Sequence, residues 1–183
     1  YQGKKYLAEL YAAGYPVIPS VLRRGDIEKL PQTDSYIVKP LRGGSRVGVK
    51  KVSREKMERA EFTDHVIQPF LKIDREVSFY FLDGALQYVL ASGGPNDRWN
   101  LTHVDPPAQF KKIAEQFVAW NTLDYGIQRI DFALTTDDAM LLMEIEDWCP
   151  KLSLAVLDER TRVEFLENLV SSLKLLSTKL IHR

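Results

Sequence analysis

Residues 36–49, YIVKPLRGGSRVGV, join two short apolar runs through a segment rich in glycine and in basic side chains. Tyr36 to Val38 and Val47 to Val52 have the composition of strands, and Lys39 stands at the end of the first. Glycine lets backbone N–H groups approach an anion closely, and Lys and Arg add positive charge. The stretch predicts either a polyphosphate-binding hairpin or a flexible hairpin with a solvated basic tip. It is neither a Walker A loop nor a dinucleotide fingerprint, because strand leads to strand rather than to a helix.

A second stretch, YGIQRIDFALTTDDAMLLMEIEDW at residues 125–148, carries acidic residues on two adjacent strands. Alternate residues of a strand share a face, so Asp131 lies on the face of Arg129, and Glu144 shares a face with Glu146. A hairpin can then bring the three carboxylates together. They repel one another unless a cation lies among them, and hard oxygen ligands suit Mg²⁺. The alternative is a half-buried hairpin with a solvated charged face, in which Arg129 pairs with Glu144.

Composition excludes several classes of protein. The chain has 183 residues, of which 45% are hydrophobic, and its 25 basic and 25 acidic residues give a formal net charge of zero. This balance argues against a nucleic-acid-binding surface. No apolar run reaches the length of a membrane span. The single cysteine, Cys149, permits no internal disulfide and favours a reducing compartment, so we expect a cytoplasmic protein.

The remaining pattern predicts mixed helices and strands. Val77 to Leu82 and Leu86 to Ala91 form a hairpin about Asp83-Gly84. Asp105 is the expected N-cap of a helix that runs to about Trp120, with Pro106 as its first residue. Thr161 and Glu164 form a capping-box pattern that opens a last helix. The expected core face of this helix is Phe165, Leu166, Leu169, Val170, Leu173 and Leu176.

Several motifs occur in an order that resembles the ATP-grasp superfamily. They are Lys39-Pro40 before the glycine-rich hairpin, VIQPFLKIDREVSFYFLDG at residues 66–84, DRWNL at 97–101, RIDF at 129–132 and MEIE at 143–146. The chain looks most similar to the glutathione-synthetase-like and ribosomal-protein-S6-glutamate-ligase-like branch, where an Arg-x-Asn precedes the Arg-x-Asp strand. Here these residues are Arg98 and Asn100.

The resemblance implies an α+β fold of the ATP-grasp type. A small antiparallel lid lobe lies over a larger antiparallel sheet with flanking helices, and ATP lies between the lobes. Residues 1–19 are then a leading helix and strand, residues 20–71 the lid subdomain, and residues 72–183 the catalytic subdomain. Members of the superfamily carry a further N-terminal domain. Because the chain opens on Tyr1 rather than Met, we expect either a fragment or a minimal natural protein.

The resemblance also implies roles for individual residues. Lys39 contacts the ATP phosphates with the loop residues, and Lys5 is the upstream phosphate-binding lysine, with Lys4 competing for that role. Glu76 binds the ribose hydroxyls, with Asp74 as a substitute. Arg129 faces the reacting carboxyl phosphate. The other nucleotide-binding candidates are Gly43, Gly44 and Ser45 in the loop, Gln68, Pro69, Phe70 and Leu71 in the adenine-binding hinge, and Asn100; Arg98 is a second catalytic candidate, and the metal ligands are Asp131, Glu144 and Glu146.

One departure from the superfamily pattern concerns Glu146, which stands where an Asn is usual. Glutamate is a competent Mg²⁺ ligand, although extra negative charge beside the γ-phosphate can weaken nucleotide binding.

The resemblance predicts an ATP-dependent carboxylate–amine ligase that uses ATP and Mg²⁺ and activates a carboxylate as an acyl phosphate. Its partners are then small-molecule or peptide carboxylates and amines, and the chain either forms a homo-oligomer or lacks an N-terminal domain. Two alternatives remain: a nucleotide-binding module without turnover, such as one part of a split enzyme, and a kinase-type phosphotransferase.

Overall fold

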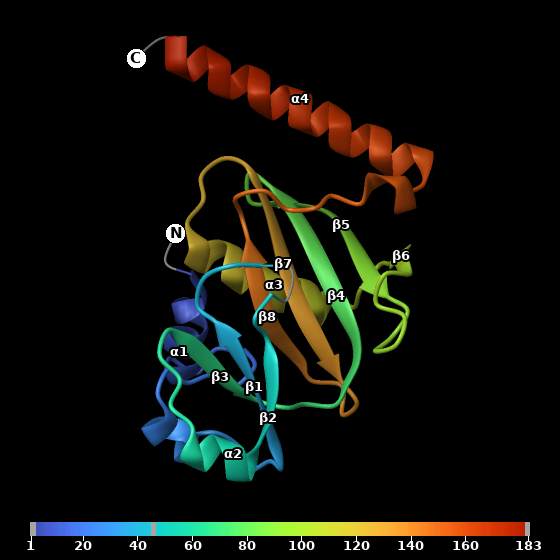
Figure 1. The fold of residues 1–183 in the computed structure, drawn as a ribbon. Coiled ribbons are helices and arrows are strands. Elements are labelled where there is room, and N and C mark those ends of the chain that lie inside the picture. The colour runs from blue at the N-terminus through green and yellow to red at the C-terminus, as the bar shows by residue number, and fades with distance from the viewer. Residues whose placement is uncertain (1–2, 45–46, 182–183) are drawn as a thin grey trace. The chain divides into compact units, whose positions relative to one another are not determined.

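The computed structural model describes residues 3–44 and 47–181 (Figure 1). The chain forms two compact units. Unit 1 is the chain up to Lys72 together with Thr135–Glu144, and unit 2 is Ile73–Leu134 together with the chain from Ile145 onward.

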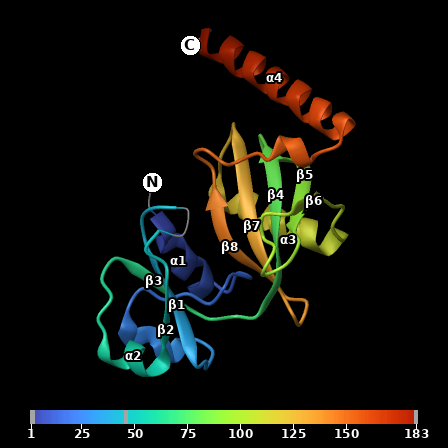
Figure 2. The same ribbon diagram turned by 45° about the vertical axis from the view of Figure 1, so that its right-hand side comes forward.

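Unit 1 contains a three-stranded antiparallel sheet with strand order β2-β1-β3 (Figure 2). Alternation along β1 buries Tyr36 and Val38, which pack with Val52, Met57 and Ile67 in one hydrophobic cluster. The elements of unit 1 are η1 (Gly3–Lys5), α1 (Tyr6–Ala12), η2 (Arg24–Lys29), β1 (Ser35–Pro40), β2 (Lys50–Ser53), α2 (Arg54–Arg59) and β3 (His65–Pro69).

Unit 2 is built on a five-stranded sheet with strand order β6-β5-β4-β7-β8. The last strand, β8, crosses the boundary between the units, because Glu144 belongs to unit 1 and Ile145 to unit 2. The elements are β4 (Ile73–Leu82), β5 (Ala85–Ser92), β6 (Leu101–His103), α3 (Ala108–Asn121), β7 (Ile127–Thr135), β8 (Met140–Glu146), η3 (Leu154–Val156) and α4 (Glu159–Ile181).

Helices cover the two faces of the unit 2 sheet differently. Helix α3 lies on one face (Figure 1), where Phe117 packs on Phe132. Phe132 also meets Phe79 edge to face, at 5.5 Å between ring centroids. On the other face, Tyr80 stacks on Tyr88 at 4.3 Å, and Phe165 of α4 closes this second cluster. Burial raises the pKa of Tyr80 to about 12, so its hydroxyl keeps its proton and donates to the Lys151 carbonyl at 3.2 Å.

The predicted hairpin of β4 and β5 is confirmed. Its two turn residues, Asp83 and Gly84, have φ values of 50° and 79°, as a type I′ turn requires. Strand β2 begins at Lys50 rather than at the predicted Val47, and β6 was not predicted.

Both predicted helix caps are wrong. Helix α3 begins at Ala108, because Pro107 forces the residue before it out of the helical region, and Asp105 instead accepts from Lys111 at 2.6 Å. Helix α4 begins at Glu159, and Asp158 rather than Thr161 provides the capping side chain. The Asp158 carboxylate accepts from the Thr161 backbone N–H at 2.9 Å and from its hydroxyl at 2.7 Å.

The predicted core face of α4 is also partly wrong. Phe165 is buried and Leu169 packs beside it, but Leu166, Val170 and Leu173 are 41%, 49% and 56% exposed. The apolar face of the helix is therefore wider than the part that unit 2 covers. Among the described residues, none of the helices combines the length and the apolar composition that a bilayer span requires.

Candidate functional site

Arg129 on β7 holds two of the predicted metal ligands of unit 2. Alternation along β7 buries Gln128 and Ile130 on one face and places Arg129 beside Asp131 on the other, as the sequence predicts. The Arg129 guanidinium donates to both Asp131 carboxylate oxygens at 2.9–3.1 Å, and its Nη2 lies 2.6 Å from Glu146 Oε2. One guanidinium thus bridges two carboxylates that point to the same place.

The two carboxylates of this cluster raise the pKa of Arg129. Burial lowers the pKa of Arg129, but the neighbouring Asp131 and Glu146 carboxylates outweigh that effect, so the pKa rises above its usual value. Arg129 is therefore always charged, and the two carboxylates leave a surplus of one negative charge. Two hard carboxylate groups around one cation position match the donor chemistry of Mg²⁺, so these residues fit that ion. The guanidinium takes this position in the structure.

The predicted convergence of three acidic residues is not found. Within residues 3–44 and 47–181, no group of three His, Cys, Asp or Glu side chains is close enough together to hold a metal ion. Asp131 and Glu146 meet at Arg129, whereas Glu144 forms an ion pair with Lys4, at 3.3 Å, inside unit 1. The alternative pairing of Arg129 with Glu144 is not observed either.

Lys4, rather than Lys5, contacts the glycine-rich loop. The Lys4 side chain is only 10% exposed, and its Nζ donates to the Gly43 carbonyl at 2.5 Å. Lys5 is exposed and pairs with Glu9 at 3.4 Å, one helical turn further along. The approach depends on Gly3, which has φ +62°, because an added Cβ there would lie 2.4 Å from the Leu41 carbonyl oxygen. Lys4 rather than Lys5 therefore contacts the loop, and the phosphate-binding role predicted for Lys5, with Lys4 as its competitor, stays a prediction.

The other loop candidates lie at the end of β1. Lys39 lies on the partly exposed face of β1, opposite the buried Tyr36 and Val38, and pairs with Val66 in register. Gly43 has φ +103°, a conformation that favours glycine. Gly44 has open space around its Cα, whereas Ser45 lies outside the described residues.

The predicted hinge, residues 68–71, begins in the last two residues of β3, and two of its polar groups already make hydrogen bonds within unit 1. The buried Gln68 side chain donates to the Ser20 hydroxyl at 2.8 Å, and the Phe70 N–H donates to the Ser35 carbonyl at 2.9 Å. The Phe70 ring is 43% exposed, and the Lys51 ammonium lies 3.4 Å from its centroid. An exposed ring here fits the predicted adenine role of Gln68 to Leu71, which stays a prediction.

Two further candidates, Glu76 and Arg98, meet in unit 2. Arg98 Nη2 lies 3.1 Å from Glu76 Oε2, and each side chain is 25% exposed. Arg98 Nε is buried and has no hydrogen-bond partner in the described part of the chain. Such a donor is rare in folded proteins. Nearby polar groups pair locally, because Asn100 donates to Asp97 at 2.9 Å and Asp74 pairs with Arg75 at 2.7 Å.

Sequence reasoning missed two polar contacts of this site. The Ser78 hydroxyl donates to Asp131 at 2.7 Å, and the Ser92 hydroxyl accepts from the Glu76 N–H at 2.9 Å. The signal for Ser78 was present, because Ser78 is a polar residue between the apolar Val77 and Phe79 and shares a strand face with Glu76.

Comparison with solved structures shows that the chain has the ATP-grasp fold, the α+β fold that the sequence predicts. The D-cycloserine synthetase DcsG matches with a TM-score of 0.67 and 24% identity over 92% of this chain and 70% of that one. The ATP-grasp ligase PsnB, solved with a minimal precursor, Mg and ADP, matches with a TM-score of 0.66 and 18% identity over 94% and 59%. The macrocyclase MdnC of Microcystis aeruginosa, bound with the precursor peptide MdnA, matches with a TM-score of 0.66 and 15% identity over 92% and 59%.

The chain spans between 59% and 70% of the length of these three proteins. No protein-family model matches the sequence, and no curated protein matches it either.

Proposed function

We propose that the chain is part or all of an ATP-dependent ligase that activates a carboxylate as an acyl phosphate and joins it to an amine. The observation that carries the proposal is the Arg129–Asp131–Glu146 cluster in a chain of ATP-grasp fold. A charged guanidinium beside two carboxylates supplies the two things that phosphoryl transfer to a carboxylate needs: a cation-binding position and a donor for the developing phosphate charge.

Unit 1 supplies the candidates for nucleotide binding in this proposal. Lys39 and Lys4 hold the phosphates with the loop amides of Gly43 and Gly44, and the backbone of residues 68–71 holds adenine. We further propose that residues 20–71 act as the lid and residues 72–183 as the catalytic subdomain, with Glu76 on the ribose.

Unit 2 supplies the candidates for chemistry. Asp131 and Glu146 are the residues that would hold Mg²⁺, which would supply positive charge to neutralise the ATP phosphates. Glu144 stays a metal ligand predicted from the sequence alone, since in the structure it pairs with Lys4. Arg129, released from its carboxylates, donates to the transferred phosphate. Arg98, with its unpaired buried N–H, helps orient the substrate carboxylate.

The reaction proceeds in two displacements. A substrate carboxylate oxygen forms a bond to the γ-phosphorus while the bond to the β–γ bridging oxygen breaks, so ADP leaves and an acyl phosphate forms. An amine nitrogen then attacks the acyl carbon, phosphate leaves, and the nitrogen loses a proton to give the amide. Neither step needs a nucleophilic side chain, because positioning and charge neutralisation carry the chemistry.

The class of substrate is part of the proposal and is inferred from proteins of the same fold. PsnB and MdnC are described with precursor peptides and DcsG as a D-cycloserine synthetase, so both peptides and small molecules occur as partners of this fold. We therefore propose a peptide or small-molecule carboxylate.

A nucleotide-binding module without turnover is the second candidate. It is favoured by the ion pairs that occupy the predicted Mg²⁺ ligands, since Arg129 holds Asp131 and Glu146 and Lys4 holds Glu144. Ligase activity requires these pairs to open when nucleotide binds, whereas a binding module does not.

Trapping of the acyl phosphate separates these candidates. The chain is incubated with Mg-ATP, pooled amino acids or peptides, and hydroxylamine, which converts an acyl phosphate to a stable hydroxamate. We expect ADP and hydroxamate in equal amounts, and a loss of both in Arg129→Gln. ADP without hydroxamate in the presence of a phosphorylated product indicates a phosphotransferase, and ATP binding without ADP release indicates the binding module.

A further inference from the structure

An apolar seam runs along an exposed side of α4. Its residues follow a heptad pattern with spacings of three and four: Val163, Leu166, Val170, Leu173, Ser177 and Leu180. All five hydrophobic members are between 41% and 63% exposed. A heptad seam that extends for about 25 Å is the pattern by which one helix packs on another.

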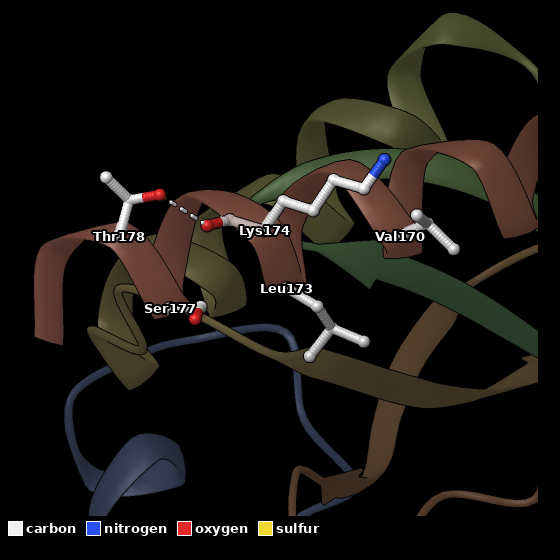
Figure 3. A pocket seen from close by; sticks show the side chains of 5 residues that line it. All are labelled: Val170, Leu173, Lys174, Ser177 and Thr178. Atoms are coloured by element: carbon white, nitrogen blue, oxygen red, sulfur yellow. Dashed lines mark hydrogen bonds between the residues drawn. The ribbon is translucent and has the colours of Figure 1, made fainter. Parts of the chain in front are cut away.

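The seam is distinct from the side of α4 that unit 2 covers. Phe165 is buried against Tyr88, Leu169 packs beside it, and Lys179 near the other end contacts the Tyr125 ring and hydroxyl. The helix is therefore attached to unit 2 near both ends while the seam stays open. Figure 3 shows Val170, Leu173 and Ser177 projecting from successive turns around a surface hollow that is lined by α4 residues alone.

We propose that this seam binds the same seam of a second copy of the chain, with the two α4 helices antiparallel about a two-fold axis. In this register Val170 lies opposite the partner copy's position 173, Leu166 opposite position 177 and Val163 opposite position 180, and the axis repeats each layer. A large side chain meets a small one in the layer of Leu166 and Ser177, so the helices approach closely there.

Charge complementarity selects the second copy as the occupant. Glu167 and Lys174 flank the seam on the same side, seven residues apart, and in the described part of the chain neither side chain has an ion-pair partner. In the antiparallel register, Glu167 of each copy lies beside Lys174 of the other, which gives two symmetric ion pairs. A surface that carries both partners of its own ion pair is self-complementary.

The antiparallel register also explains the flanking residues better than a parallel one. A parallel pair places Ser177 opposite Ser177 in one layer and leaves Lys174 beside Leu169, although it brings Glu167 beside Arg162. The antiparallel pair buries Ser177 against Leu166 and gives both Glu167 and Lys174 an oppositely charged neighbour. The proposed dimer is independent of the ligase chemistry, because none of its residues is a candidate site residue.

The oligomeric state of the chain tests the proposal directly. Sedimentation velocity over a wide range of concentrations is expected to show a monomer–dimer equilibrium for the wild type. Leu173→Lys is expected to raise the dissociation constant by about tenfold or more, because it places a charge in the centre of the seam. Leu175→Lys is the matched control, since Leu175 is 52% exposed on the same helix but lies off the seam. A wild type that stays monomeric, or equal effects of the two variants, would overturn the proposal.

A charge exchange tests the register. Glu167→Lys and Lys174→Glu each place like charges together in the antiparallel dimer, so each is expected to weaken it several-fold. The double variant restores opposite charges and is expected to return the dissociation constant close to that of the wild type. In a parallel dimer residues 167 and 174 do not meet, so additive losses in the double variant would contradict the antiparallel arrangement.

Discussion

Arg129 contacts both candidate metal ligands of unit 2. Its guanidinium contacts Asp131 and Glu146 together, and the hydroxyl of Ser78 donates to Asp131 from the neighbouring strand. The sequence resemblance places Glu146 where the superfamily usually has Asn, and in the structure Glu146 lies 2.6 Å from Arg129. The negative charge of Glu146 is therefore balanced by the Arg129 guanidinium in the structure.

Substitution of Glu146 tests whether it is a metal ligand. Glu146→Gln and Glu146→Asn each remove one formal charge from the proposed cation position, so both are expected to raise the Mg²⁺ concentration at half-maximal ATP hydrolysis several-fold. A Mg²⁺ titration of hydrolysis by the wild type and the two variants measures this. A higher turnover in Glu146→Asn would show instead that Glu146 is an inhibitory charge, and three identical curves would exclude both roles.

The two adjacent lysines before α1 offer a matched comparison. Lys4→Ala removes a nearly buried ammonium that contacts Gly43 and Glu144, and is expected to lower the free energy of unfolding by roughly 1–3 kcal/mol. Lys5→Ala removes an exposed pair with Glu9 and is expected to change it by less than about 0.5 kcal/mol. Urea unfolding gives both values. Similar losses in the two variants would contradict the assignment of Lys4 as the loop contact.

Local patterns predicted most of the strands and helices. The hairpin at Asp83-Gly84, strand β1 and the alternation around Arg129 all follow from nearest-neighbour signals, and the structure confirms them. The predicted helix caps were wrong because each helix start offers two candidate positions. Helix α3 begins after Pro107 rather than after Asp105, and α4 is capped by Asp158 rather than by Thr161.

Features that depend on contacts far apart in the sequence were not predictable. The choice between Lys4 and Lys5 depends on where residues 41–43 lie, which no local pattern records. The width of the apolar face of α4 was visible in the sequence, but which part unit 2 covers was not, because that depends on the positions of Tyr80 and Tyr88.

The glycine-rich hairpin contains a second matched pair. Gly48 has φ +75°, and an added Cβ would lie 2.8 Å from Pro40 Cγ, so Gly48→Ala is expected to destabilise unit 1 by roughly 1–2 kcal/mol. Gly44 has open space, so Gly44→Ala is expected to change stability by less than about 0.5 kcal/mol. Denaturant unfolding compares them, and equal stability of the two variants would contradict the described hairpin conformation.

The cap of α4 predicts a pH dependence of stability. Hydrogen bonds from the Thr161 backbone and hydroxyl lower the pKa of Asp158 from its usual value of 3.8. Because the folded-state pKa is depressed, this stabilisation is present above the unfolded-state pKa and is lost as pH falls through the folded-state pKa. Asp158→Asn removes the titration, so its Tm is expected to fall less than that of the wild type between about pH 5 and about pH 3. Parallel losses of Tm would contradict the cap.

At the scale of the whole molecule, the central proposal is that the chain binds Mg-ATP. Unit 1 carries Lys39, Lys4 and the loop glycines, and unit 2 carries the cluster at Arg129. The solved structures of this fold extend beyond the span of the chain, since it covers 70% of DcsG and 59% of PsnB. Nucleotide binding is therefore a more direct test than turnover, because it does not depend on the identity of the substrates.

Calorimetric titration of Mg-ATP into the wild type, Lys39→Ala and Lys56→Ala tests this claim. The wild type is expected to bind, and Lys39→Ala is expected to lose roughly 1.5–3 kcal/mol, the scale of a charge-assisted hydrogen bond, which is about 10- to 150-fold in affinity. Lys56→Ala removes an exposed lysine of α2 and is expected to bind like the wild type. A wild type that does not bind Mg-ATP, or equal affinities for the wild type and Lys39→Ala, would contradict the account.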